Sequence, residues 1–204
     1  MADMLVDGRR VELRDGDTVL EAARRAGARI PTLCYDPRLE PGGSCRLCLV
    51  EVEGIGWPVP SCAYPASEAM AVRTRSDALH RFRRDLLDLV LSEQPDGECP
   101  RCTQIGPCEL HLLAVEYGAW GGRFSGAQSG ARADDGNPFI LRDYSRCIYC
   151  YRCTRVCNEV EQAHAIVPGG RGFDSRITTL LNRGLMDTSC TFCGQCINTC
   201  PTGA

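Results

Sequence analysis

Fifteen cysteines occur in this 204-residue chain, and all of them fall into four sets with the spacing of metal-cluster ligands. Four sites with four protein ligands each need sixteen ligands, so one set is a ligand short. Ligand sets this dense divide the chain into small modules, and such modules depend on bound metal for much of their folding free energy. The sets are Cys34, Cys45, Cys48 and Cys62; Cys99, Cys102 and Cys108; Cys147, Cys150, Cys153 and Cys157; and Cys190, Cys193, Cys196 and Cys200.

Disulfide bonds are the alternative explanation of so many cysteines. Three features argue against them: the count is odd, the N-terminus has no apolar signal run, and many cysteines are separated from the next by two residues. That last spacing is typical of ligands to one shared metal centre. We therefore expect reduced thiols and a cytoplasmic protein. No segment approaches the length of a membrane-spanning helix.

The charge balance argues against a nucleic-acid partner. The net charge is −3 and the isoelectric point about 5.7, whereas nucleic-acid binders usually carry a basic face. The sequence also lacks a phosphate-cradling glycine loop, a nucleophile–base pair and a dinucleotide fingerprint. No catalytic residue is assigned, so we expect catalysis to belong to another region or to a partner.

Residues 1–75 are predicted to form a β-rich domain. Two short strand-like runs at residues 4–6 and 11–13 flank Asp7-Gly8, a hairpin turn signal. Thr18 and Glu21 form a capping box that opens a short helix, for which Gly27 is a natural end. The order strand, turn, strand, helix and cysteine loop is that of a β-grasp ferredoxin.

Residues 76–118 are predicted to form a small helical domain. Ser76 caps a helix that runs to about Leu91, and a second helix over residues 109–117 ends at Gly118. The first helix is predicted to bury one apolar stripe and to expose the arginines and aspartates between its members. Residues 119–138 are rich in Gly, Ala and Ser and are predicted to be a linker to a last domain, 139–204. The stripe consists of Leu79, Phe82, Leu86 and Val90.

The last domain contains the same motif twice, C-x2-C-x2-C-x3-C. In two-cluster ferredoxins three cysteines of such a run hold one 4Fe–4S cluster and the fourth reaches the other cluster. This rule assigns Cys200 to the first run and Cys157 to the second. The alternative is a pair of zinc sites, although zinc favours two well-separated cysteine pairs. The two predicted sets are Cys147, Cys150, Cys153 and Cys200, and Cys190, Cys193, Cys196 and Cys157.

The first set, C-x10-C-x2-C-x13-C, lies in the predicted β-grasp domain. Four thiolates brought together by a loop suit a 2Fe–2S cluster. Backbone N–H groups of Gly42, Gly43 and Ser44 are candidate donors to its sulfur atoms. A zinc ribbon is the alternative, because Cys45 and Cys48 form a knuckle-like pair.

Several segments resemble the N-terminal iron–sulfur region of the complex I 75-kDa subunit family. This family also includes NAD-dependent formate dehydrogenase alpha subunits, cytosolic iron-only hydrogenases and the diaphorase small subunit of NAD-reducing hydrogenases. The two complete ferredoxin motifs are closest in pattern to the formate dehydrogenase and iron-only hydrogenase members. The segments that carry the resemblance are Ile30-Pro-Thr-Leu-Cys34-Tyr, Gly43-Ser-Cys45-Arg-Leu-Cys48, Ser61-Cys62, Asn137-Pro-Phe-Ile, Arg146-Cys147-Ile, Arg155-Val-Cys157-Asn-Glu-Val, Cys193-Gly-Gln-Cys196 and Cys200-Pro-Thr-Gly.

The resemblance implies a third 4Fe–4S cluster at Cys99, Cys102 and Cys108. Relatives complete this site with a histidine four residues before the first cysteine, whereas Gln94 takes that place here with one extra residue intervening. The sixteenth ligand stays open between His111, another group such as Gln94, Glu98 or solvent, and a three-iron cluster. His111 is a candidate because it lies three residues after Cys108, on the same predicted helix face.

These expectations add up to an α+β protein with a β-grasp 2Fe–2S domain, a helical 4Fe–4S domain and a double 4Fe–4S ferredoxin-like domain. The resemblance implies an electron-transfer module with one 2Fe–2S and three 4Fe–4S clusters. It would link a flavin/NAD-binding subunit to a formate dehydrogenase (molybdopterin) or hydrogenase catalytic site. The alternatives are a structural zinc-binding scaffold and a stand-alone ferredoxin-like electron carrier.

Overall fold

The computed structural model describes residues 2–94, 108–124 and 136–204. The chain divides into two compact units, of which the first comprises Met1–Tyr35 and Pro41–Leu86 and the second comprises Asp36–Glu40 and Leu87–Ala204. Both units combine helices with a small sheet, which confirms the α+β class. None of the helices in the described ranges is long and apolar enough to cross a membrane.

The first unit begins with the predicted hairpin. Strand β1 (Asp3–Val6) pairs antiparallel with β2 (Arg9–Glu12), with Met4 opposite Val11. Asp7 and Gly8 both adopt left-handed φ angles, 49° and 80°. Two successive positive φ values define the tight turn whose twist matches a β-hairpin, and glycine and aspartate tolerate them best.

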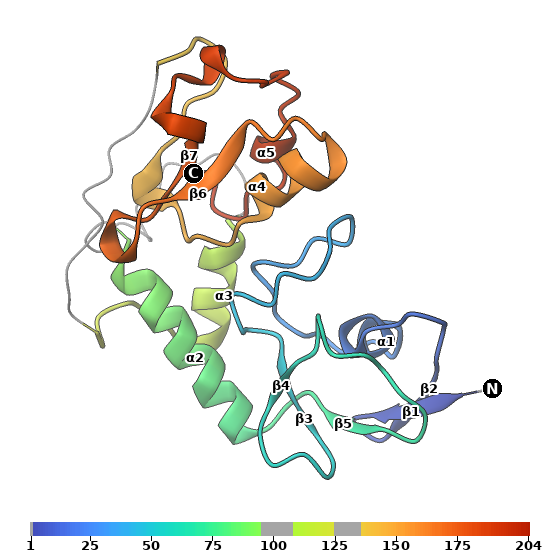
Figure 1. Ribbon diagram of the computed structural model, residues 1–204. Coiled ribbons are helices and arrows are strands. Elements are labelled where there is room, and N and C mark those ends of the chain that lie inside the picture. The colour runs from blue at the N-terminus through green and yellow to red at the C-terminus, as the bar shows by residue number, and fades with distance from the viewer. Residues whose placement is uncertain (1, 95–107, 125–135) are drawn as a thin grey trace. The chain divides into compact units, whose positions relative to one another are not determined.

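A five-stranded mixed sheet forms around this hairpin (Figure 1). The strand order is β2-β1-β5-β3-β4; β1 and β5 run parallel, and the other neighbours run antiparallel. This is the arrangement expected of a β-grasp sheet. The remaining strands are β3 (Leu49–Val52), β4 (Val59–Pro60) and β5 (Ala71–Arg73).

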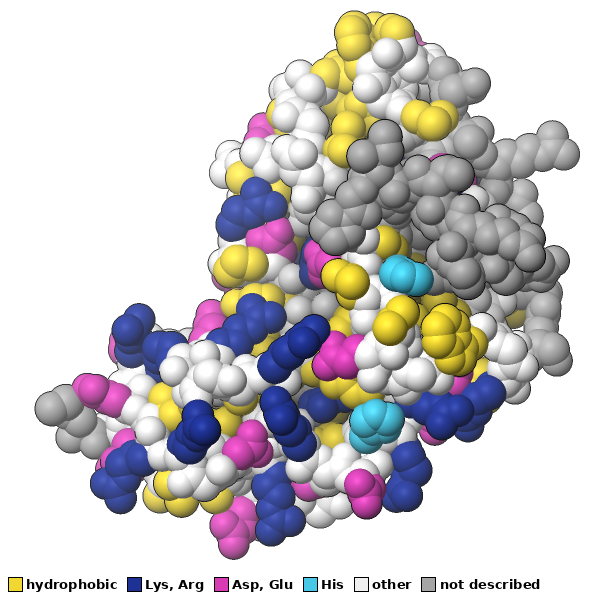
Figure 2. Space-filling view, turned by 180° about the vertical axis from the view of Figure 1, so that it is seen from behind, with side chains coloured by type: hydrophobic (Ala, Val, Ile, Leu, Met, Phe, Trp, Pro, Cys, Tyr) yellow, Lys and Arg dark blue, Asp and Glu magenta, His cyan; other side chains and the backbone are white. Residues whose placement is uncertain are grey.

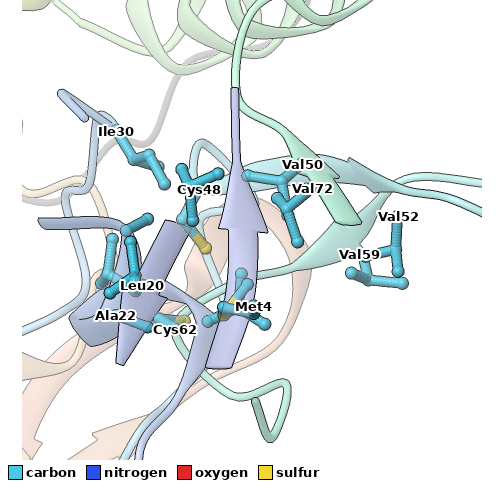
Figure 3. Packing of buried hydrophobic residues seen from close by; sticks show 14 of the residues in the cluster. Met4, Leu20, Ala22, Ile30, Cys48, Val50, Val52, Val59, Cys62 and Val72 are labelled. Carbon is cyan, nitrogen blue, oxygen red and sulfur yellow. The ribbon is translucent and has the colours of Figure 1, made fainter. Parts of the chain in front are cut away.

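Helix α1 (Val19–Arg25) begins at the predicted capping box. The Thr18 hydroxyl accepts from the Glu21 N–H at 3.3 Å, and the Glu21 carboxylate accepts from the Thr18 N–H at 2.9 Å. Gly27 follows the helix with a φ of 80°. Four apolar residues of the helix join the core of the sheet, which also includes Cys48 and Cys62 (Figure 3). Two of the candidate ligand cysteines are therefore part of the hydrophobic core of this unit.

Helix α2 (Asp77–Ser92) has the predicted length and begins at Ser76, whose hydroxyl accepts from the Leu79 N–H at 3.1 Å. The prediction of its buried face was wrong in part. Phe82 is 47% exposed, whereas Arg83 and Asp88 are 3% and 1% exposed. Arg83 can be buried because its guanidinium donates to the backbone carbonyl oxygens of residues 47 and 49.

Helix α3 (Glu109–Tyr117) also has its predicted bounds, and Gly118 ends it in the left-handed conformation, with a φ of 64°. The segment after it is part of the folded unit as far as residue 124. Ala119 is fully buried, and the N–H groups of Trp120 and Gly121 both donate to Asp88. The start of the predicted linker is therefore packed on α2, and residues 125–135 lie outside the described part.

The C-terminal part of the second unit contains an antiparallel two-stranded sheet of β6 (Ile166–Gly169) and β7 (Arg176–Thr179). Two short helices, α4 (Arg152–Arg155) and α5 (Gln195–Asn198), each follow a pair of cluster cysteines along the chain. A core of Ile140, Ile166, Ile177 and Leu185 packs against several of these cysteines. Among residues 136–204, few apolar side chains are buried, as expected of a module that folds around cofactors.

Charged side chains of both signs lie on one face of the described part. On the face shown in Figure 2, arginines and acidic residues of the described part lie interspersed. The whole chain has 23 basic residues, all arginine, and 26 acidic ones.

Candidate iron–sulfur sites

The four cysteines of the first set converge in the first unit. Cys34, Cys48 and Cys62 are at most 1% exposed, and Cys45 is half-buried. The Cys45 and Cys62 thiols donate to Cys34 and lower its pKa, and the Cys62 thiol lowers the pKa of Cys48 to about 7. The same hydrogen bonds to Cys34 raise the pKa values of Cys45 and Cys62, so the four thiols are in mutual contact and two of them favour the thiolate form. This donor set fits a cluster held by four thiolates.

Hydrogen-bond donors surround the same sulfur atoms. The Cys45 N–H donates to Cys34 Sγ at 3.5 Å, and the Ser44 side chain also donates to Cys34. The Ser61 side chain donates to Cys48, and the Ser61 hydroxyl also donates to the Cys48 carbonyl oxygen at 2.7 Å. Such donors stabilise negative charge on sulfur. The predicted loop of residues 42–44 does supply one donor, although through the Ser44 side chain.

Only Cys108 of the second set lies within the described residues. It is the residue before α3 and has an extended backbone. His111 is half-buried on the first turn of α3, and Gln94 follows α2. The predicted ligands Cys99 and Cys102 and the candidate Glu98 lie outside the described residues. The choice among the sixteenth-ligand candidates therefore stays a prediction.

All eight cysteines of the third and fourth sets line one cavity of about 170 Å³. The remaining lining is mainly apolar, with side chains such as Ile140, Ile166 and Leu185. In the described part of the chain, no three side chains of the usual metal-binding types are arranged around a single ion. The eight sulfurs instead surround a shared hollow, and this arrangement fits multi-iron clusters whose ligands attach to separate corners.

The electrostatic neighbours of these cysteines reveal which of them lie together. Burial raises the pKa of Cys147 to about 11 and of Cys150 to about 12, and the nearby Cys200 thiolate adds to both shifts. Burial also raises the pKa of Cys196, with added repulsion from Cys190, Cys193 and Cys157. Cys200 therefore lies near Cys147 and Cys150, and Cys157 lies near Cys196. Burial also raises the pKa of Cys153, with added repulsion from both Cys200 and Cys196, so the two runs meet at this cavity and the assignment of each cysteine to one cluster stays a prediction.

The two cysteine runs share a backbone geometry as well as a sequence pattern. Tyr149 and Tyr151 have φ angles of 52° and 60°, and the equivalent residues of the second run, Phe192 and Gly194, have 55° and 74°. The left-handed conformation costs a non-glycine residue about 1 kcal/mol or more. Each run thus turns sharply twice between its cysteines, so that three side chains can face one cavity.

The second residue after the first cysteine of each run donates its N–H to that cysteine. Tyr149 donates to Cys147, and Phe192 donates to Cys190 Sγ at 3.4 Å. Near the C-terminus the Ala204 N–H donates to Cys200 Sγ at 3.3 Å. Tyr149 and Phe192 are themselves left-handed residues, so the turn that bends each run also contributes an N–H group to its first cysteine.

Sequence reasoning missed the charged residues that support this cavity. Arg152 is 6% exposed between Cys150 and Cys153, and it forms an ion pair with Glu109, the residue after Cys108. Asp36 accepts from the Thr199 hydroxyl at 2.8 Å, and the Arg38 guanidinium holds the pKa of Asp36 well below its usual range. A charged residue inside or directly beside a cysteine motif was the available signal.

Comparison with known proteins assigns both ends of the chain. Residues 1–77 match the 2Fe-2S iron-sulfur cluster binding domain family. Residues 137–204 match the ferredoxin-like domain of NADH-quinone oxidoreductase subunit 3. These matches support iron–sulfur binding at the first cysteine set and in the C-terminal part.

Two curated relatives align with almost the whole chain. The NADP-reducing hydrogenase subunit HndD of Solidesulfovibrio fructosivorans is 38% identical over 210 residues, which cover 100% of this chain and 36% of the relative. The 78 kDa subunit of NADH-ubiquinone oxidoreductase from Neurospora crassa is 37% identical over 204 residues, which cover 99% of this chain and 27% of the relative. The chain therefore spans little more than a third of one and about a quarter of the other.

One solved structure is similar over its own length too. A chain of NAD+-reducing [NiFe]-hydrogenase in the H2-reduced state superposes with a TM-score of 0.89 at 36% identity, covering 100% of this chain and 86% of that one. The sequence-based resemblance is thereby confirmed. The chain belongs to the family of iron–sulfur subunits that includes the 75-kDa and 78-kDa subunits of NADH-ubiquinone oxidoreductase and subunits of NAD- and NADP-reducing hydrogenases.

Proposed function

We propose that this chain binds one 2Fe–2S and three 4Fe–4S clusters and conducts electrons between a flavin/NAD-binding subunit and a separate catalytic site. The observation that carries the proposal is the cavity lined by all eight cysteines of the two C-terminal runs. Iron–sulfur clusters supply one-electron redox chemistry when bound. The chain's own residues hold the clusters in place, shield them from water and set the charge around them.

In the first unit Cys34, Cys45, Cys48 and Cys62 are the proposed ligands of the 2Fe–2S cluster. Their contacts with one another and the burial of three of them support this role. Hydrogen bonds from N–H and hydroxyl groups to the sulfurs favour the more negative, reduced state and so raise the reduction potential. The surrounding hydrophobic core keeps the site dry and rigid (Figure 3).

In the second unit the two C-terminal clusters are proposed to exchange their fourth ligands. Cys147, Cys150 and Cys153 share one site with Cys200, and Cys190, Cys193 and Cys196 share the other with Cys157. The repulsion of Cys147 and Cys150 by Cys200, and of Cys196 by Cys157, supports this division. Crossed ligands tie the two runs together, so each site stabilises the fold of both.

The remaining 4Fe–4S cluster is proposed at Cys99, Cys102 and Cys108, with His111 as the candidate fourth ligand. The half-buried position of His111, one helical turn after Cys108, supports a ligand role. A neutral histidine ligand and a glutamine side chain carry the same charge, whereas a carboxylate ligand would make the site more negative.

The proposed partners follow from the relatives. The hydrogenase relatives are named as NADP-reducing and NAD+-reducing, and the other relatives as NADH-ubiquinone oxidoreductase subunits. We therefore assign a flavin/NAD-binding subunit to one end of the electron path. A hydrogenase or molybdopterin-dependent formate dehydrogenase site takes the other end. Free thiols at all thirteen described cysteines fit a reducing, cytoplasmic setting.

The direct test is the metal content of the protein after anaerobic reconstitution with iron and sulfide. We expect about fourteen iron atoms per chain, the total for one 2Fe–2S and three 4Fe–4S clusters. The protein should be brown, with broad visible absorption that bleaches on reduction. Far fewer irons in intact protein, or a colourless zinc protein, would refute the proposal.

A further inference from the structure

An ion pair with a buried arginine and a partly exposed carboxylate joins two cysteine sets within the second unit. Arg152 Nη1 donates to Glu109 Oε1 at 2.7 Å, and Nη2 donates to Oε2 at 2.9 Å. This two-point fork is the strongest geometry available to an arginine and a carboxylate. Nη1 also donates to the Thr199 carbonyl oxygen at 3.3 Å, so the guanidinium is fixed from two sides.

The guanidinium lies among the proposed ligands of one cluster. Arg152 stands between Cys150 and Cys153 in sequence, and the Thr199 carbonyl that it binds precedes Cys200. Its backbone N–H donates to Cys150, and its positive charge offsets part of the burial that raises the pKa of the same thiol. Within the described residues no atom accepts a hydrogen bond from Arg152 Nε, so this buried N–H remains available to a sulfur atom.

The carboxylate lies on the other side of the pair, next to Cys108. Glu109 is held there by its own N–H, which donates to the Pro201 carbonyl oxygen at 2.9 Å. The two charges differ in exposure, 7% for the Arg152 side chain and 44% for that of Glu109. Water therefore screens the negative charge more than the positive one, and the positive charge is also closer to Cys150 in sequence.

On the basis of the proposed function, we propose that Arg152 raises the reduction potential of the cluster held by Cys147, Cys150, Cys153 and Cys200, and that Glu109 limits this effect. Reduction adds one negative charge to a cluster. A fixed positive charge in a dry site stabilises that added charge, and a carboxylate opposes it. Arg152 is thus a positioning and potential-setting residue, since its side chain is not itself a ligand.

The test compares Arg152→Gln and Glu109→Gln in the reconstituted protein by EPR-monitored redox titration. Both changes break the same ion pair, yet we expect opposite shifts. Arg152→Gln should lower the potential of one 4Fe–4S component by about 59 mV, a tenfold change in its reduction equilibrium, and Glu109→Gln should raise it. The component is identified as the one lost in Cys150→Ala.

The control is Arg171→Gln, which removes the same charge from an exposed arginine of the same unit and should shift no component measurably. Arg152→Lys keeps the charge and should retain most of the wild-type potential. If the Arg152→Gln variant binds less iron than the wild type, the potential shift of Glu109→Gln alone tests the proposal, because that variant keeps the guanidinium. If the two variants shift the potential in the same direction, or shift it not at all at full iron content, the proposal is wrong but the electron-transfer function stands. Missing clusters in the wild-type protein would refute the function itself.

Discussion

Asp88 connects the exit of α3 to α2, and its removal gives a sharp test of the described fold. Its Oδ1 accepts from the Trp120 N–H at 2.9 Å and from the Gly121 N–H at 3.1 Å. Its Oδ2 accepts from Arg123 at 3.2 Å. The carboxylate therefore holds residues 119–124 against the helix, on the part of the chain that flanks the second cysteine set.

Asp88→Ala leaves two backbone N–H groups without their acceptor. A buried donor without an acceptor costs about 1–3 kcal/mol. The Trp120 side chain is 65% exposed, so water reaches part of the segment, and we take a total near the lower end, about 2 kcal/mol. Since 1.4 kcal/mol is tenfold in an equilibrium constant, the segment should open about thirtyfold more often.

Amide hydrogen exchange measures this opening directly. Residues 119–124 should exchange about thirtyfold faster in Asp88→Ala. Asp88→Asn should have a smaller effect, because its amide oxygen can still accept from both N–H groups. Arg81→Ala, at an exposed position of the same helix, is the control. If residues 119–124 exchange no faster in Asp88→Ala than in Arg81→Ala, Asp88 does not hold this segment against α2.

Two further substitutions test other parts of the fold. Thr18→Ala removes the capping hydroxyl of α1 and should destabilise the first unit by about 1 kcal/mol. Thr18→Ser keeps the hydroxyl and is the control. If the 2Fe–2S visible signal is lost at the same urea concentration in both variants, the hydroxyl does not stabilise the helix as a cap. Gly170→Ala would place a Cβ 2.1 Å from the Asp174 carbonyl oxygen at a φ of 76°, whereas Gly172→Ala at 55° meets open space. Gly170→Ala should therefore loosen the β6–β7 hairpin more, and equal hydrogen exchange of its amides in the two variants would exclude this close approach.

The elements with local signals were predictable from the sequence. Asp7-Gly8 predicted the hairpin, the Thr18 capping box predicted α1, and Gly118 predicted the end of α3; each acts within a few residues of the chain. The α+β class was predictable for the same reason, because it follows from these local helix and strand signals. The division into three domains and a linker stays a prediction, although the two family matches begin and end close to two of its boundaries.

The buried face of α2 was predicted wrongly because the burial of charge depends on distant partners. Arg83 and Asp88 occupy buried positions, where backbone carbonyl and N–H groups far along the chain satisfy them. Periodicity treats every charged residue as exposed, so Phe82 was placed inside in their stead. Only the tertiary structure brings those partners to α2, so the sequence of the helix does not predict them.

Candidate ligand sets could be proposed from the sequence because cluster geometry imposes a strict spacing, and their assignment to clusters stays a prediction. The residues around them could not, since the Arg152–Glu109 pair joins positions 43 residues apart. The segment Asp36–Glu40 shows the same limit. It begins two residues after Cys34, yet it belongs to the second unit, where Asp36 accepts from Thr199 and Arg38 donates to Gln195 at 3.0 Å.

The crossing of ligands between the two C-terminal runs is tested most directly by EPR-monitored redox titration of four single variants. These variants are Cys147→Ala, Cys157→Ala, Cys190→Ala and Cys200→Ala. We expect Cys157→Ala to alter the same 4Fe–4S component as Cys190→Ala, and Cys200→Ala the same component as Cys147→Ala. If Cys157→Ala instead alters the component affected by Cys147→Ala, each run holds its own cluster and the proposed ligand assignment is wrong.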